Sequence, residues 1–160
     1  MSFSPVLTEA DGFKLALHPA PGLEAPLAED IALLKAAGVS AVVTTLTEAE
    51  LASLGLTALG QSLEAARLSW FHLPVEDKSL PAGAFDARWP EALPQLKALL
   101  EAGERVSVHC RGGTGRTGLV AAKLVLSCGG DWDKTLAAIR AARPGALTAE
   151  SQLDYLKAGR

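Results

Sequence analysis

Cysteine, aromatic residues and long apolar runs are all scarce in this sequence. Its 160 residues include only two cysteines, Cys110 and Cys128, which do not make a disulfide framework. Aromatic residues make up 5% of the chain, so we expect an aliphatic core of Leu, Val and Ala. No run approaches the roughly 18 apolar residues of a membrane span, and no signal peptide is visible. The sequence therefore predicts a cytoplasmic protein with reduced thiols.

A surplus of positive charge is also missing. The chain has 15 Lys and Arg residues against 18 Asp and Glu residues, which gives a formal net charge of −3. Proteins that bind nucleic acid or anionic membranes along a surface carry a basic face, so we expect neither partner. The apolar content of 49% is enough for a folded core. The length predicts a single domain over residues 1–160, which we expect to be monomeric.

Short apolar runs alternate with helical patterns along the chain, which predicts an α/β fold of packed layers. The Asp11-Gly12 pair predicts a tight turn between the first two strands. Strands are expected at residues 6–8, 13–17, 39–46, 68–73 and 105–109.

The helical segments carry recognisable start signals. Thr47 and Glu50 form the pattern of a capping box, while Asp131 and Thr148 are expected to cap later helices. Pro90 and Pro94 predict an irregular first part of their helix, with regular structure starting near Pro94. Helices are expected at residues 28–37, 85–102, 116–128, 131–142 and 148–157, besides the short one that Thr47 opens.

One segment, residues 109–118, carries the chemistry. It reads His-Cys-Arg-Gly-Gly-Thr-Gly-Arg-Thr-Gly and lies between a predicted strand and a predicted buried helix. A glycine-rich turn of this kind binds phosphate, because its N–H groups converge and the helix N-terminus adds positive charge. This setting should lower the pKa of the Cys110 thiol, and the Arg116 guanidinium can bind two phosphate oxygens at once. A thiolate beneath a phosphorus atom held in this way is arranged for in-line attack.

The pattern His-Cys-x5-Arg-Thr resembles the catalytic loop of the cysteine-dependent protein tyrosine phosphatase superfamily. The chain is most similar to dual-specificity phosphatases of the kinase-associated type, over roughly residues 25–157. The resemblance continues in His72-Leu73-Pro74-Val75-Glu76-Asp77 and in Arg143-Pro144-Gly145-Ala146-Leu147 followed by Gln152. It implies a dual-specificity phosphatase-like fold, with a central, mostly parallel sheet flanked by helices. A Walker-type nucleotide loop fits less well, because no Gly-Lys-Ser/Thr is present.

The resemblance also implies roles for the residues of the loop. Cys110 would be the nucleophile that forms a phosphocysteine intermediate, and Thr117 would hydrogen-bond its thiolate. His109 would steady the loop through backbone contacts. The substrate phosphate would be bound by Arg111, Gly112, Gly113, Thr114, Gly115 and Arg116.

A general acid is needed as well, because the leaving oxygen must be protonated. The resemblance implies Asp77, in the loop at residues 74–81, and Glu76 and Asp86 are its rivals. Gln152 is a candidate for placing the hydrolytic water, and Arg143 is expected to be structural. No metal or cofactor is expected, since the three histidines are scattered. Cys128 is expected to be buried, and too far from Cys110 for a disulfide.

The substrate stays open at this point. The chain has a single Tyr, Tyr155, far from where the family places the Tyr that walls a deep phosphotyrosine pocket. A shallow pocket would admit phosphoserine and phosphothreonine, on a phosphoprotein or a small phosphomonoester. Phe85 and Trp89 are either lip residues or core. Arg111 keeps an inositol phosphate or phosphoinositide substrate open, and a non-catalytic phosphate-binding module is the alternative of another class.

Overall fold

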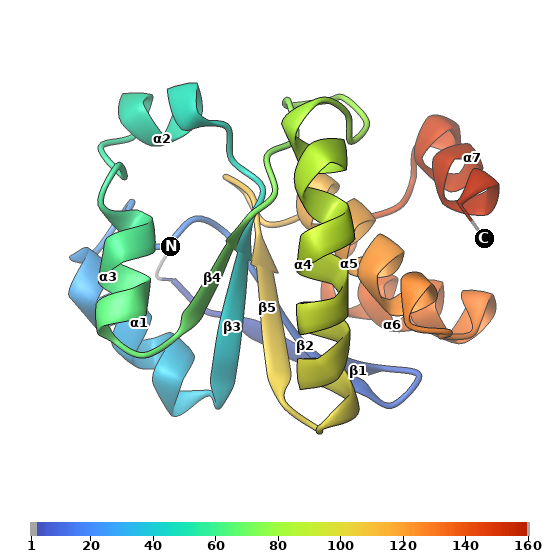
Figure 1. Ribbon diagram of the computed structural model, residues 1–160, viewed down its shortest axis with the longest axis horizontal. Helices are drawn as coiled ribbons and strands as arrows, with labels where there is room; N and C mark the ends of the chain where they lie inside the picture. The colour runs from blue at the N-terminus through green and yellow to red at the C-terminus, as the bar shows by residue number, and fades with distance from the viewer. Residues whose placement is uncertain (1–2, 160) are drawn as a thin grey trace.

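The computed structural model describes residues 3–159 (Figure 1), and its sheet is the mostly parallel one that was expected. The five strands lie in the order β1-β2-β5-β3-β4. The β1–β2 pair is antiparallel, and all other neighbours are parallel. The strands are β1 (Val6–Ala10), β2 (Phe13–His18), β3 (Val39–Thr44), β4 (Ser69–His72) and β5 (Arg105–His109).

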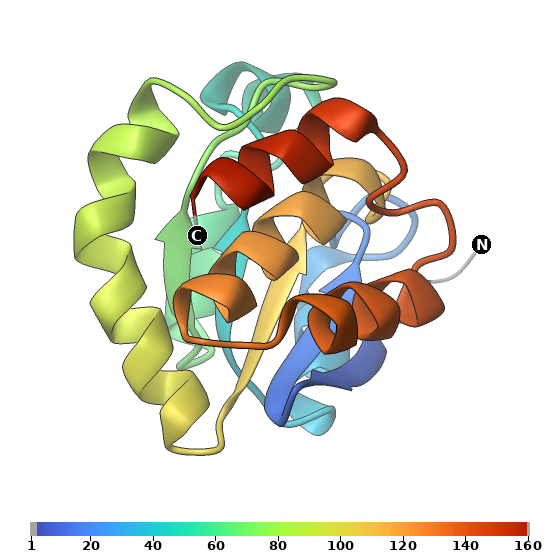
Figure 2. The same cartoon turned by 90° about the vertical axis from the view of Figure 1, so that its right-hand side faces the viewer.

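Helices cover both faces of the sheet (Figure 1; Figure 2). One face packs against α1 and α3, and the other against α4, α5 and α6, while α7 lies on α5. Each face has its own aliphatic core, because successive strand residues point to opposite sides. The helices are α1 (Leu27–Ala36), α2 (Glu48–Ser53), α3 (Leu59–Ala65), α4 (Ala84–Glu101), α5 (Gly115–Ser127), α6 (Trp132–Ala142) and α7 (Glu150–Ala158).

Several local signals are confirmed. Asp11 and Gly12 both have positive φ, 49° and 86°, as the two central residues of a tight β-hairpin turn require. The Thr47 side chain and the Glu50 side chain form the reciprocal capping box of α2. Asp131 accepts a hydrogen bond from the Lys134 N–H and so caps α6.

The prediction that α4 is irregular before Pro94 is wrong, because the helix is continuous from Ala84 to Glu101. Pro90 and Pro94 lie four residues apart on the exposed side of the helix. The two backbone hydrogen bonds that they remove therefore free carbonyl groups on the solvent side, where water can bind them. The opposite side of α4 buries Phe85, Leu96 and Leu100, and this packing keeps the helix in place.

The predicted cap of α7 is also wrong. The N-cap is Ala149, without a side-chain hydrogen bond, whereas the Thr148 hydroxyl donates to the carbonyl of Gly145.

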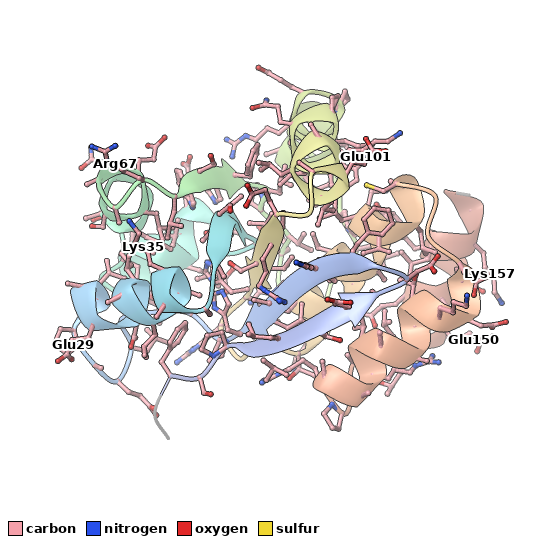
Figure 3. The ribbon with its side chains drawn as sticks, turned by 90° about the horizontal axis from the view of Figure 1, so that it is seen from below. Glu29, Lys35, Arg67, Glu101, Glu150 and Lys157 are labelled. Atoms are coloured by element: carbon pink, nitrogen blue, oxygen red, sulfur yellow. The ribbon has the colours of Figure 1, made fainter. Side chains whose placement is uncertain are left out.

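Charged residues of the outer helices face solvent in Figure 3, and Lys35 of α1 donates to the carbonyl of Ala66 after α3. Within residues 3–159, no helix is both long and apolar enough to cross a membrane.

Candidate active site

The candidate site lies at the carboxyl end of β5, where the chain turns into α5. Both neighbouring strands hold the start of this turn. The Thr45 N–H and hydroxyl, just after β3, donate to the carbonyl of His109 at 3.1 and 2.8 Å. The Ala20 N–H, just after β2, donates to the carbonyl of Arg111 at 3.0 Å. The loop is therefore anchored from both sides before it reaches the helix.

The Cys110 thiol points into the loop and is only 4% exposed. Its Sγ accepts hydrogen bonds from the Gly113 N–H and the Thr117 hydroxyl, each at 3.2 Å. Burial by itself raises the pKa of the thiol. The hydrogen bonds from Thr117 and Gly113 and the charge of Arg116 outweigh burial, so the pKa lies below its ordinary value. The geometry thus favours a thiolate at the base of the loop.

Gly113 has a steric reason to be glycine. Its φ is 83°, and a Cβ at this position would lie 2.6 Å from the backbone carbon of His18. No side chain fits there, so this close approach keeps the Gly113 N–H directed at the Cys110 sulfur.

His109 is held by a chain of buried hydrogen bonds. Its Nδ1 lies 3.0 Å from the carbonyl of Cys110, which can only accept, so this nitrogen carries the proton. Its Nε2 then accepts from the Thr44 hydroxyl at 2.7 Å, and Thr44 accepts from the Trp70 indole at 2.8 Å. Burial lowers the pKa of His109 to about 4, which matches a neutral ring that supports the backbone of Cys110.

Arg116 has a counter-ion that the sequence patterns did not identify. Its two terminal nitrogens donate to the two carboxylate oxygens of Glu50, at 2.7 and 3.0 Å. One of them also donates to the carbonyl of Val75 at 2.9 Å. Glu50 was recognised only through its capping box with Thr47, which it also forms. A buried arginine at the start of an apolar helix needs a carboxylate partner. This requirement was the sequence signal from which a counter-ion of Arg116 could have been predicted.

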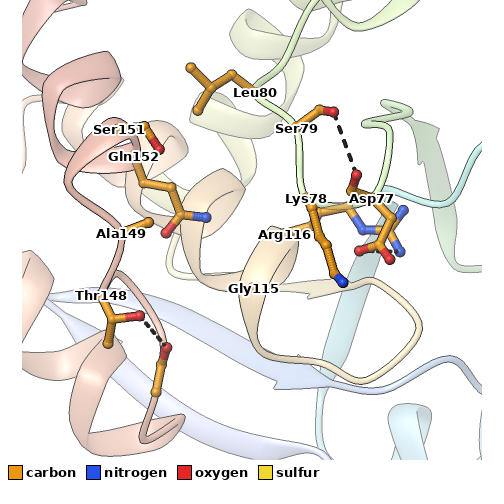
Figure 4. A pocket seen from close by; sticks show the side chains of 11 residues that line it. Asp77, Lys78, Ser79, Leu80, Gly115, Arg116, Thr148, Ala149, Ser151 and Gln152 are labelled. Atoms are coloured by element: carbon orange, nitrogen blue, oxygen red, sulfur yellow. Dashed lines mark hydrogen bonds and ion pairs between the residues drawn. The ribbon is translucent and has the colours of Figure 1, made fainter.

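The carboxylate of Asp77 reaches the same guanidinium, with Oδ1 3.6 Å from Nη2 of Arg116. Both residues line a cavity of about 300 Å³, together with Lys78 and Gln152 (Figure 4). The rest of its lining is Ser79, Leu80, Gly115, Gly145, Thr148, Ala149 and Ser151.

The rival acids lie elsewhere. Glu76 lines a different cavity beside Glu48, and Asp86 is exposed in the first turn of α4. Of the three carboxylates, only Asp77 lines the cavity that also contains Arg116.

Arg111 does not point to the cavity of Arg116. It lines a second cavity of about 470 Å³ with Gly112 and Arg143, over an apolar wall that includes Phe3. Arg143 donates to the carbonyl of Gly112 at 2.8 Å and to the hydroxyl of Thr114 at 3.2 Å. It therefore braces the loop, in the structural role expected of it.

One open alternative is decided and one prediction needs correction. Of the two roles left open for Phe85, the core is the one observed, because the side chain is fully buried and stacks on Trp89 with ring centroids 5.2 Å apart. Cys128 is half-buried and not buried, because it follows the end of α5, where the helix reaches the surface. Both cysteines are free thiols.

Several solved phosphatases share this fold. Kinase-associated phosphatase, solved with its catalytic site cysteine replaced by serine, has a TM-score of 0.82 and 23% identity, over 98% of this chain and 93% of that chain. Tk-PTP in its active form has a TM-score of 0.71 and 25% identity, over 96% and 95%. PTPMT1 in complex with PI(5)P has a TM-score of 0.67 and 19% identity, over 96% and 94%. No curated protein matches the chain by sequence.

A family match and the fold together define a cysteine-dependent phosphatase of the dual-specificity type. Residues 18–130, more than half of the chain, match a family described as "Polymorphic toxin system, DSP-PTPase phosphatase". The chain belongs to this family, Tc-R-P.

Proposed function

We propose that this phosphatase hydrolyses phosphate monoesters on proteins, at tyrosine and also at serine and threonine, through a phosphocysteine intermediate. The observation that carries the proposal is the Cys110 thiol, which accepts two hydrogen bonds at the base of a loop that leads directly into α5. A thiolate stabilised in this way needs no separate base to become a nucleophile.

In the first step, Sγ of Cys110 attacks the phosphorus atom and the ester P–O bond breaks. The loop N–H groups and Arg116 bind the phosphoryl oxygens, and Glu50 fixes the orientation of the guanidinium. Asp77 donates its proton to the leaving oxygen. Its position 3.6 Å from Arg116, in the same cavity, supports this role.

In the second step, a water molecule attacks the phosphocysteine. The Asp77 carboxylate takes the proton of the water, the S–P bond breaks, and inorganic phosphate leaves. The Thr117 hydroxyl, 3.2 Å from Sγ, stabilises the thiolate as it departs. Gln152 lines the cavity and is the candidate for orienting the water.

The breadth of the proposed specificity follows from the cavity lining. Its side chains are polar, charged or small apart from Leu80, and none is aromatic. Tyr155 lies in α7, where its ring packs against Lys123 of α5, and it does not line this cavity. A deep, ring-walled slot for phosphotyrosine is thus missing among the described residues, which supports access for the shorter phosphoserine and phosphothreonine.

The test compares wild-type enzyme with Cys110→Ser and Asp77→Asn on phosphopeptides and aryl phosphates. Cys110→Ser should abolish turnover while the protein still binds vanadate, because the loop N–H groups and Arg116 remain. Asp77→Asn should slow poor leaving groups, such as serine, far more than a nitrophenolate. Unchanged turnover in Cys110→Ser would refute the mechanism, and an equal loss on both leaving groups would remove Asp77 from the acid role.

A further inference from the structure

Lys78 is the one cavity residue whose charge the mechanism above does not use. It follows Asp77 and lines the same cavity as Arg116. Figure 4 shows its side chain extending toward the start of α5 at Gly115, beside Asp77 and Arg116. Neighbouring side chains in an extended segment point to opposite sides, but Lys78 has a φ of 59°, in the left-handed region that lysine rarely adopts. With this backbone conformation, the consecutive residues Asp77 and Lys78 both line the same cavity.

The Lys78 ammonium is also unneutralised. Among residues 3–159 it has no hydrogen-bond or ion-pair partner, whereas Arg116 is paired with both oxygens of Glu50. The opposite wall of the cavity, formed by Thr148, Ser151 and Gln152, carries no charge. The one carboxylate in the lining, Asp77, lies 3.6 Å from Arg116, so Lys78 contributes a positive charge to the cavity without a direct ion-pair partner among the described residues.

The cavity also has room for more than one phosphate group. Its volume of about 300 Å³ is roughly ten times the share of a water molecule in the liquid. Gly115 and Arg116, which would bind the phosphate, form one part of its lining. Lys78, Ser79 and Leu80 form another part, where the groups next to the phosphorylated residue can lie.

We propose that Lys78 determines specificity by binding a carboxylate next to the phosphorylated residue, so that the preferred substrate is an acidic phosphorylated protein segment. This inference rests on the proposed function, because it assigns a feature of the same protein substrate. A lysine offers a mobile point charge, which suits a carboxylate whose position varies between substrates.

The test uses two phosphotyrosine peptides that differ only at the residues flanking the phosphotyrosine, which are Glu in one and Gln in the other. Wild-type enzyme should show a kcat/KM about tenfold higher on the Glu peptide at low salt, with the ratio falling as salt is added. Lys78→Gln should bring the ratio close to one. Lys78→Glu should reverse the preference, toward a third peptide flanked by Lys.

Lys134→Gln is the matched control, because Lys134 is exposed on α6 and lies outside this cavity. It should keep the wild-type ratio. Equal ratios in wild type and Lys78→Gln would overturn the inference and leave the proposed function standing. If wild-type enzyme hydrolyses aryl phosphate but none of the phosphopeptides, the proposed function fails and the inference fails with it.

Discussion

Glu50 performs two tasks with a single carboxylate. Its Oε1 accepts the Thr47 N–H at 3.1 Å, which completes the capping box, and also accepts from Arg116 at 2.7 Å. The hydrogen bonds with Arg116 and Thr47 outweigh partial burial and lower the pKa of Glu50. Glu50 therefore stays ionised at neutral pH, as an orienting partner of Arg116 requires.

Replacing Glu50 by Gln should separate these two tasks. Glutamine can still complete a capping box, but it cannot neutralise Arg116. We expect kcat/KM to fall on the order of 10- to 100-fold, because the guanidinium loses its fixed orientation. Steady-state kinetics on an aryl phosphate measure this effect.

Thr47→Ala is the control for this substitution. It removes the cap and should cost about 1 kcal/mol of stability, while the Glu50–Arg116 pair and kcat/KM stay near wild type. A large loss of activity in Thr47→Ala together with a small loss in Glu50→Gln would contradict the assignment.

At the residue scale, the sequence predicted what is local. Cys110, Gly113 and Thr117 lie within eight consecutive positions, so their spacing already implied that they meet. Glu50 and Arg116 are 66 residues apart, and only the packing of α2 against the loop joins them. Arg111 shows the reverse case, because membership of the loop did not reveal which cavity its side chain would line.

At the scale of elements, short-range signals were reliable where a side chain acts on its own helix. The capping box of α2 and the Asp131 cap of α6 are of this kind. The continuity of α4 was not predictable from local propensity, because the buried side of that helix compensates for its two prolines. Helix propensity describes an isolated segment, whereas α4 is held by its contacts with β5 and α5.

Replacing Pro94 by Ala should therefore stabilise the protein. The new N–H can donate to the carbonyl of Pro90, and proline in a helix interior is about 3 kcal/mol less favourable than alanine. The more flexible unfolded chain offsets about 1 kcal/mol of this gain. We expect a net rise of about 1–2 kcal/mol in the free energy of unfolding, measured by urea denaturation.

Pro26→Ala is the matched control for Pro94→Ala. Pro26 is the N-cap of α1, where no intrahelical donor is missing. This variant should be neutral or slightly destabilised. A Pro94→Ala protein no more stable than Pro26→Ala would show that α4 is strained for another reason.

At the scale of the whole molecule, two buried histidines link the sheet to the site. His18 of β2 and His109 of β5 are paired in register, and their rings stack with centroids 5.3 Å apart. Phe3 meets His18 edge-on, and the charge of Arg143 faces it. Burial lowers the pKa of His18 to about 3 and that of His109 to about 4. The charge of His109 adds to the effect at His18, and the charges of His72 and Arg116 add to the effect at His109.

Stability should consequently fall in mild acid. Below pH 6.5 the unfolded chain binds protons on both histidines while the folded protein does not, until the pH approaches 4 for His109 and 3 for His18. The free energy of unfolding should drop by up to about 1.4 kcal/mol per pH unit for each histidine. Urea denaturation at pH 7, 6 and 5 measures the slope.

His18→Phe keeps an aromatic ring at the stack and removes one titrating group. Its slope between pH 7 and 5 should be shallower than that of the wild type, whatever its absolute stability, while His109 and His72, whose pKa is also lowered, keep their contributions. An unchanged slope would mean that His18 is not the group that titrates.

The two cysteine thiols differ in reactivity and in solvent exposure. Cys110 has a lowered pKa but is 4% exposed, whereas burial raises the pKa of Cys128, which is half-buried at the end of α5. Small electrophiles and peroxide therefore meet their reactive target at the base of the loop, and bulky labelling reagents can reach only the slower thiol. A dye attached to Cys128 would mark the molecule without entering the catalytic loop.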